Sequence, residues 1–209
     1  MGMSSLRRIA IVGAQSTGKS WLARALTEVL RERNEPVHQV PERLREGPTP
    51  HPHAQLRMAQ AQANAVLAIG SGTVIADTTP LVMAVYSHLC FSDESLFAMA
   101  LEHQRLYDQT LLTGLDMASR EQTPFDAKLR DGLTRSGIGF RVVYGQGLAR
   151  LNNALLALGL PPEHEAAWQR REAAQFALNE GRTPWLCEKC SDPDCEHRLF
   201  TGLIQRASL

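Results

Sequence analysis

The residues best suited to chemistry stand near the N-terminus, where residues 13–20 read GAQSTGKS. They match the pattern G-x-x-x-x-G-K-[S/T], whose glycines let successive backbone N–H groups point at phosphates at the start of a helix. The lysine of such a loop pairs with the β- and γ-phosphates, and the next hydroxyl ligates Mg²⁺. We therefore predict that the chain binds a purine nucleoside triphosphate, ATP, through this loop, with Lys19 at the phosphates and Ser20 on Mg²⁺. The predicted ATP-binding residues are Gly13, Ala14, Gln15, Ser16, Thr17, Gly18, Lys19, Ser20 and Trp21.

The sequence around this loop supplies the context that the motif needs. Residues 7–12 (RRIAIV) read as a short buried strand, and apolar residues recur at helical spacing from residue 18 to about residue 33. A chance match in an unrelated loop has no such strand before it or helix after it. The loop is therefore expected to join the first strand to the first helix.

The rest of the chain alternates strand and helix patterns as far as residue 158, which predicts a parallel sheet covered on both faces. The expected fold is α/β, a P-loop kinase-like sheet of five parallel strands with helices on both faces. The remaining strands are expected at 37–40, 73–76, 109–114 and 140–144, and the remaining helices at about 54–69, 81–89, 93–107 and 148–158. A polar segment, residues 116–139, separates the last two strands.

Two acidic residues follow predicted strands, Glu42 after the second and Asp77 after the third. Ligands of open parallel sheets bind at the carboxyl ends of strands. With the third strand beside the first, Asp77 lies near the γ-phosphate, where it holds a Mg²⁺-bound water or accepts the proton of an attacking hydroxyl. Glu42 is expected farther out, at the hydroxyl groups of a substrate. The alternative is that either acid caps the next helix, and the sequence Asp77-Thr78-Thr79-Pro80 also fits a cap.

The polar segment between the last two strands carries Arg130 and Arg135. Guanidinium groups on a loop in this place resemble the lid of small kinases, where they close over the phosphoryl group and exclude water. Arg130 is the first choice for this catalytic role and Arg135 the second. A solvated, charged helix is the alternative.

Three cysteines and a histidine gather near the C-terminus in the pattern C-x2-C-x4-C-x-H. Zn²⁺ favours four tetrahedral nitrogen and sulfur ligands, and a C-x2-C turn supplies two sulfurs on one side of the ion. We predict a structural zinc site; free thiols or a disulfide are the alternatives. The predicted ligands are Cys187, Cys190, Cys195 and His197.

Composition narrows the class of protein. The 209 residues include 22 Lys and Arg and 22 Asp and Glu, so the formal net charge is +0, whereas nucleic-acid binders usually carry a basic surplus. No apolar stretch suggests a signal peptide or a membrane span. We expect a cytoplasmic protein with residues 1–160 as the nucleotide-binding domain and residues 161–209 as a C-terminal helix and zinc segment.

Several stretches together resemble a known family, the ribosylnicotinamide kinase domain of bacterial NAD-regulatory proteins and its stand-alone relatives. They are residues 9–26 (IAIVGAQSTGKSWLARAL), 75–87 (IADTTPLVMAVYS), 107–116 (YDQTLLTGLD), 130–132 (RDG) and 142–155 (VVYGQGLARLNNAL). The resemblance implies ATP-dependent phosphorylation of the ribose 5′-hydroxyl of nicotinamide riboside. It places Lys19 and Ser20 at ATP and Mg²⁺, Asp77 at the reacting hydroxyl and Arg130 in the lid. Gln15 departs from the family, which often has glutamate there.

Three other functions remain open. The chain is either a kinase of another nucleoside or small alcohol, a regulatory ATPase that acts on a protein partner, or a zinc module that binds nucleic acid. ADP release that depends on an added acceptor separates a kinase from a switch, and salt-sensitive retention on nucleic acid marks the third.

Overall fold

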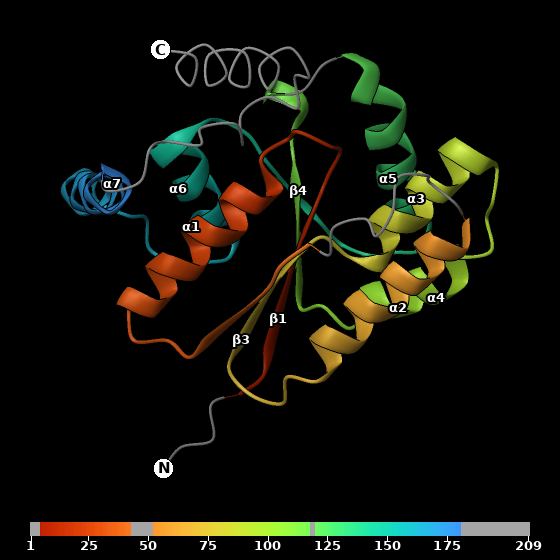
Figure 1. Cartoon of the computed structure of the whole chain (residues 1–209), viewed down its shortest axis with the longest axis horizontal. Coiled ribbons are helices and arrows are strands. Elements are labelled where there is room, and N and C mark those ends of the chain that lie inside the picture. The colour runs from red at the N-terminus through yellow and green to blue at the C-terminus, as the bar shows by residue number, and fades with distance from the viewer. Residues whose placement is uncertain (1–4, 43–51, 118–119, 181–209) are drawn as a thin grey trace, which may run out of the picture. The chain divides into compact units, whose positions relative to one another are not determined.

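The protein is represented by a computed structural model, which describes residues 5–42, 52–117 and 120–180. The chain forms two compact units, residues 1–163 and residues 164–209. The described part of the second unit is the helix α7 (Glu165–Glu180). The first unit contains the sheet and the remaining helices (Figure 1).

The sheet of the first unit has five strands, all parallel, in the order β2-β3-β1-β4-β5. The predicted α/β sheet is thus confirmed, and β3 lies directly beside β1. Parallel strands need crossover connections, and the helices between them provide these. The strands are β1 (Arg7–Val12), β2 (Val37–Val40), β3 (Thr73–Asp77), β4 (Gln109–Thr113) and β5 (Arg141–Val143).

Helices cover both faces of this sheet. Figure 1 shows α1 and α6 on one side and α2 to α5 on the other, and contacts join α1 to α6 and α3 to α2, α4 and α5. The helices are α1 (Lys19–Glu32), α2 (Pro52–Leu67), α3 (Pro80–Phe91), α4 (Phe97–Gln104), α5 (Thr123–Arg135) and α6 (Gly147–Ala157), with short 3-10 turns at Leu115–Met117 and Arg120–Gln122.

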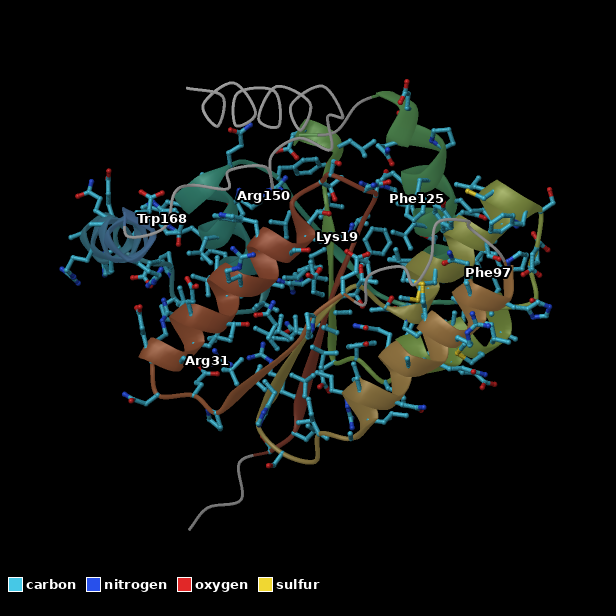
Figure 2. All side chains as sticks on the ribbon, viewed as in Figure 1. Lys19, Arg31, Phe97, Phe125, Arg150 and Trp168 are labelled. Atoms are coloured by element: carbon cyan, nitrogen blue, oxygen red, sulfur yellow. The ribbon has the colours of Figure 1, made fainter. Side chains whose placement is uncertain are left out.

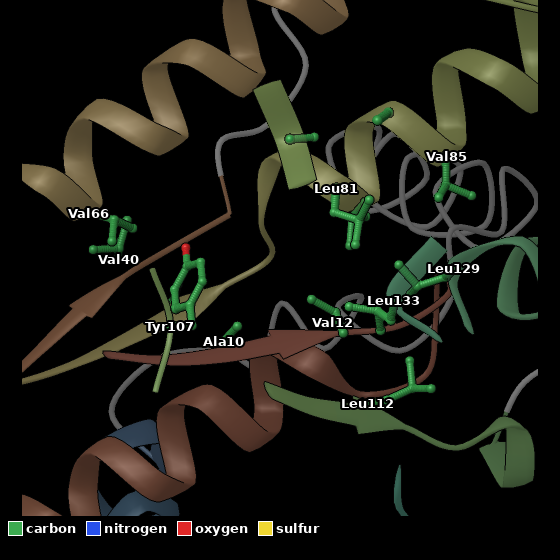
Figure 3. Packing of buried hydrophobic residues seen from close by; sticks show 14 of the residues in the cluster. Ala10, Val12, Val40, Val66, Leu81, Val85, Tyr107, Leu112, Leu129 and Leu133 are labelled. Carbon is green, nitrogen blue, oxygen red and sulfur yellow. The ribbon is translucent and has the colours of Figure 1, made fainter. Parts of the chain in front are cut away.

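The alternation of side chains along β1 divides the core between the two faces. Ala10 and Val12 belong to the apolar cluster that contains Leu81 of α3, and Figure 3 shows these side chains facing one another. Ile9 and Ile11 are also fully buried and point to the opposite face, because successive residues of a strand alternate. A central strand buried on both faces explains why residues 9–12 (IAIV) form a continuous apolar run.

The segment expected to be a polar lid loop contains a helix, so the loop prediction was wrong and the alternative of a charged helix is correct, except that one face of the helix is buried. The helix α5 has proline in its first turn and buries Leu129 and Leu133, which lie four residues apart and join the same apolar cluster as Leu81. Its Gly132 also packs within 4.0 Å of Phe97, measured to an ideal Cβ. Two leucines at helical spacing stand among the charged residues of this segment, and their burial is enough to pack the helix against α3.

The helix α4 is shorter than the predicted residues 93–107 and begins at Phe97. A side chain explains the later start, because Asp93 accepts a hydrogen bond from the Ser95 backbone N–H at 3.0 Å and another from the Ser87 hydroxyl at 3.0 Å. Aspartate that binds the backbone two residues ahead forms a turn that competes with helix.

Candidate active site

The loop between β1 and α1 has the curled backbone that phosphate binding requires. Gly13 and Gly18 have φ angles of 152° and 79°, and Ser16 also has a positive φ of 59°. An ideal Cβ on Gly13 would lie 2.1 Å from Thr113 Oγ1, so β4 leaves room only for glycine. Gly18 is the N-cap of α1 and offers no capping side chain, which leaves the first N–H groups of the helix available to an anion.

Thr17 and Thr113 fix this loop to the sheet. Thr17 Oγ1 donates to the Ala14 carbonyl at 2.7 Å and lies 2.6 Å from Thr113 Oγ1, which itself lies 3.2 Å from the carbonyl of Val12. The strand order explains the contact, because β4 pairs with β1 along its length. Sequence reasoning missed Thr113; its only signal was a polar residue at the end of a buried strand.

Lys19 lies at the start of α1 and is buried, with 7% of its surface exposed (Figure 2). Its Nζ donates to the Ala14 carbonyl at 2.9 Å, so the ammonium group lies against the phosphate-binding loop. Burial lowers the pKa of Lys19, while the charges of Glu42 and Asp77 act in the opposite direction. Two carboxylates and the loop lysine therefore share one site. Ser20 and Trp21 follow in the first turn of α1, and Gln15 and Ser16 are exposed on the loop.

Asp77 ends β3 directly opposite Ile11 of β1, which places it beside the loop. It is 2% exposed, and its Oδ1 has no hydrogen-bond partner among the described residues. Burial raises the pKa of Asp77, against the effects of the Ser20 hydroxyl, the Lys19 charge and the Glu42 backbone N–H. The acid is thus held near the phosphate site with one oxygen unsatisfied.

A helix-cap role does not explain Asp77. The helix α3 begins at Pro80, its N-cap is Thr79, and no side chain forms a capping hydrogen bond. Thr79 Oγ1 is buried and has no partner among the described residues either. Asp77 lies two residues before the cap. The cap alternative for this acid is therefore removed, while its part in catalysis stays a prediction.

The residues around Asp77 were not foreseen from the sequence. Thr78 has a φ of 79°, a left-handed conformation that is rare for a β-branched residue and costs about 1–3 kcal/mol. Gln62 of α2 is fully buried, and its Nε2 donates to the carbonyls of Asp77 and Thr78 at 3.4 and 3.2 Å. Gln62 Oε1 is buried without a hydrogen-bond partner among the described residues. Backbone strain and unsatisfied polar atoms at the end of one strand are typical of a functional site.

Glu42 follows β2, the next strand beyond β3, and its side chain is exposed at the rim of the site. Its pKa is raised, mainly by partial burial and further by the charge of Asp77, while Lys19 opposes the shift. The structure therefore brings Glu42, Asp77 and Lys19 together, as the strand ends predicted. Its contact with a substrate hydroxyl stays a prediction.

The two predicted lid arginines are held by aspartates on α5. Arg130 Nε and Nη2 contact the two carboxylate oxygens of Asp126 at 2.5 and 3.3 Å, and Asp126 raises the pKa of this guanidinium through these hydrogen bonds. Arg135 pairs with Asp131 at 2.7 Å, and its side chain is 80% exposed in the last turn of α5. Arg130 would have to leave Asp126 to reach a phosphate. The structure places Arg135 in no contact with the loop.

The predicted zinc ligands lie outside the described residues. They are Cys187, Cys190, Cys195 and His197. Within the described ranges, no group of three or more His, Cys, Asp or Glu side chains has the arrangement of a metal site. The same described ranges contain no helix long and apolar enough to cross a membrane.

With this geometry in view, a family model described as "AAA domain" matches residues 8–147. The match includes the phosphate-binding loop and reaches all five strands. The chain belongs to this AAA domain family. No curated protein matches the chain.

Two solved structures are similar to the structure of this chain. One is the YorR protein of Bacillus subtilis in complex with phosphorylated GDP, at 11% identity and a TM-score of 0.44, covering 72% of this chain and 94% of that one. The other is thymidylate kinase of Ehrlichia chaffeensis, at 15% identity and a TM-score of 0.48, covering 74% and 96%.

Proposed function

We propose that the protein is an ATP-dependent kinase that phosphorylates a hydroxyl group of a nucleoside-like small molecule. The observation that carries the proposal is Asp77 beside the phosphate-binding loop, a buried carboxylate with one oxygen that has no hydrogen-bond partner among the described residues. A hydroxyl that approaches the γ-phosphate from this side gives Asp77 Oδ1 the hydrogen bond it lacks. Resemblance in sequence makes nicotinamide riboside the first candidate acceptor.

Different residues of the site have different roles in the proposed reaction. The N–H groups of the loop and Lys19 bind the β- and γ-phosphates. The acceptor oxygen forms a bond to the γ-phosphorus while the bond to the β,γ-bridging oxygen breaks, ADP leaves, and the hydroxyl proton passes to Asp77. Because burial raises the pKa of Asp77, it is a stronger base than an ordinary carboxylate once ionised.

Ser20 and Asp77 also fit a magnesium ion. Mg²⁺ prefers oxygen ligands, and the Ser20 hydroxyl lies at the start of α1, next to the end of β3 that carries Asp77. In the part of the chain that the structure describes, Asp77 Oδ1 has no other hydrogen-bond partner. The ion would neutralise charge on the phosphates. Asp77 thus has two candidate roles, as a base or as an outer ligand of the metal. The C-terminal cysteines and histidine stay a proposed structural zinc site.

Release of ADP tests the kinase. Wild-type protein with Mg²⁺ and ATP is assayed alone and with a panel of nucleosides that includes nicotinamide riboside. We expect acceptor-dependent ADP release that Lys19→Ala abolishes and that Arg141→Met, a change at an exposed position of β5, leaves intact. Wild-type turnover in Lys19→Ala would refute the assignment.

A regulatory ATPase that acts on a protein partner is the second candidate, because the same phosphate-binding loop would serve hydrolysis of ATP as well as transfer to a small acceptor. Such a protein hydrolyses ATP slowly without a small acceptor and accelerates with its partner. If no nucleoside or small alcohol stimulates ADP release while slow, Lys19-dependent hydrolysis persists, this second function replaces the first.

A further inference from the structure

One arginine of α6 lies buried beneath the phosphate-binding loop. Arg150 is 1% exposed, and Figure 2 shows it on α6, next to the end of α1 that carries Lys19. Burial of a guanidinium group is costly unless it is paired and hydrogen-bonded. The contacts that offset this cost therefore indicate the role of Arg150.

Both terminal nitrogens of Arg150 have partners in neighbouring segments. Nη1 donates to the backbone carbonyl of Thr17, inside the loop, and Nη2 contacts Asp116 Oδ1 at 2.9 Å. The second oxygen of Asp116 accepts from the Gly145 backbone N–H at 2.7 Å. One guanidinium thus joins the phosphate-binding loop to the segments that follow β4 and β5.

The bond to Thr17 has a consequence for the next peptide unit. In a planar trans peptide the C=O and the following N–H point in opposite directions. Because the Thr17 carbonyl is held toward Arg150, the N–H of Gly18 points away from it, out of the protein core. Gly18, with its φ of 79°, then leads into the exposed amides at the start of α1.

We propose that Arg150 is a positioning residue of the phosphate-binding loop, which sets the direction of the Thr17–Gly18 peptide toward the phosphates. The proposal rests on the phosphate-binding part of the proposed function and is independent of the acceptor. Arg150 reaches the phosphates only through the backbone, so its removal weakens phosphate binding and leaves Lys19 and Ser20 in place.

Calorimetric titration of full-length protein with Mg-ATP and with inorganic tripolyphosphate tests the role. Arg150→Met keeps an unbranched side chain and removes both bonds, and we expect the Kd for ATP and for tripolyphosphate to rise in parallel by about 10- to 100-fold, the scale of losing a charged hydrogen bond. Arg150→Lys keeps the charge but cannot bridge both partners, so it should give an intermediate Kd. Arg141→Met should bind as wild type does.

A second readout separates positioning from stability alone. The NMR shift of the Gly18 amide should move in ligand-free Arg150→Lys and stay unchanged in Arg141→Met. If Arg150→Met does not fold, Asp116→Asn replaces it, because that side chain is 30% exposed and only one of its two hydrogen bonds would survive. The Kd should then rise by a smaller factor.

Three results would overturn the role: an unchanged Kd in folded Arg150→Met and in Asp116→Asn, a loss confined to ATP with tripolyphosphate unaffected, or full rescue by lysine. The absence of ATP binding by wild-type protein would instead refute the proposed function itself.

Discussion

Replacement of Asp77 by asparagine should make the ligand-free protein more stable and the enzyme much slower. The change keeps the shape of the side chain and removes its charge. Asp77 is 2% exposed, and burial raises its pKa, so the loss of hydration of the charged carboxylate destabilises the folded state. Asparagine keeps one acceptor for the bonds from Ser20 and the Glu42 N–H but loses the attraction to Lys19. We therefore expect a net gain of about 1 kcal/mol in the free energy of unfolding, or about 2–4 °C in Tm.

The pH dependence of this gain gives a sharper test. Burial raises the pKa of Asp77 in the folded state, so the folded protein holds its proton more tightly than the unfolded chain does. Stability therefore falls as pH rises from the unfolded pKa through the folded pKa. The advantage of Asp77→Asn in urea unfolding should be small near pH 4 and reach its full size above the folded pKa, as expected from linkage. Asp131→Asn, at an exposed aspartate paired with Arg135, is the matched control and should show neither effect.

Turnover completes the experiment. If Asp77 accepts the proton or holds the metal, kcat should fall by roughly 10²-fold or more in Asp77→Asn, the scale of general-base effects. A variant that is less stable than wild type at every pH and turns over at the wild-type rate would contradict both the desolvation of the Asp77 carboxylate and its catalytic role.

Three further predictions concern other parts of the chain. Gly13→Ala should abolish ATP binding measured by calorimetry, because the added Cβ would lie 2.1 Å from Thr113 Oγ1, and a wild-type Kd would refute this account of the loop. His103 is buried against Tyr107, with ring centroids 5.4 Å apart, and burial lowers its pKa. Wild-type protein should therefore lose stability as pH falls below the unfolded histidine pKa of about 6.5, and His103→Phe should lose less in urea unfolding. Protein purified without added metal should contain one zinc per chain by elemental analysis, while ATP binding should survive moderate chelation, since the predicted ligands follow the phosphate-binding loop and all five strands in the sequence. Zinc-free protein with all four cysteines reactive toward a thiol reagent would refute the zinc site.

The phosphate-binding loop could be read from the sequence because its chemistry is local. Eight consecutive residues contain the glycines, the lysine and the hydroxyl that the function needs, and the strand and helix that hold them are their direct neighbours. The strands were also visible, since each is a short stretch that contains valine, isoleucine or leucine between turn residues. Prediction failed at α5, where charged residues outnumber the two leucines that dock the helix, and at the start of α4, where one aspartate side chain redirects the backbone.

By itself, the sequence determined the nucleotide loop, the parallel sheet and the placement of Glu42 and Asp77 at strand ends. Only the tertiary structure showed that Thr113, Gln62 and Arg150 belong to the same site. Each comes from a segment distant in the chain and has an ordinary sequence context, so no motif marks it. Their roles arise from the order of the strands, which places β3 and β4 on either side of β1 and so gathers their carboxyl ends around one loop. Among the described residues, burial there leaves one oxygen of Asp77 without a hydrogen-bond partner, and it pairs the guanidinium of Arg150 with Thr17 and Asp116. Burial is a property of the packed fold and is not marked in the sequence.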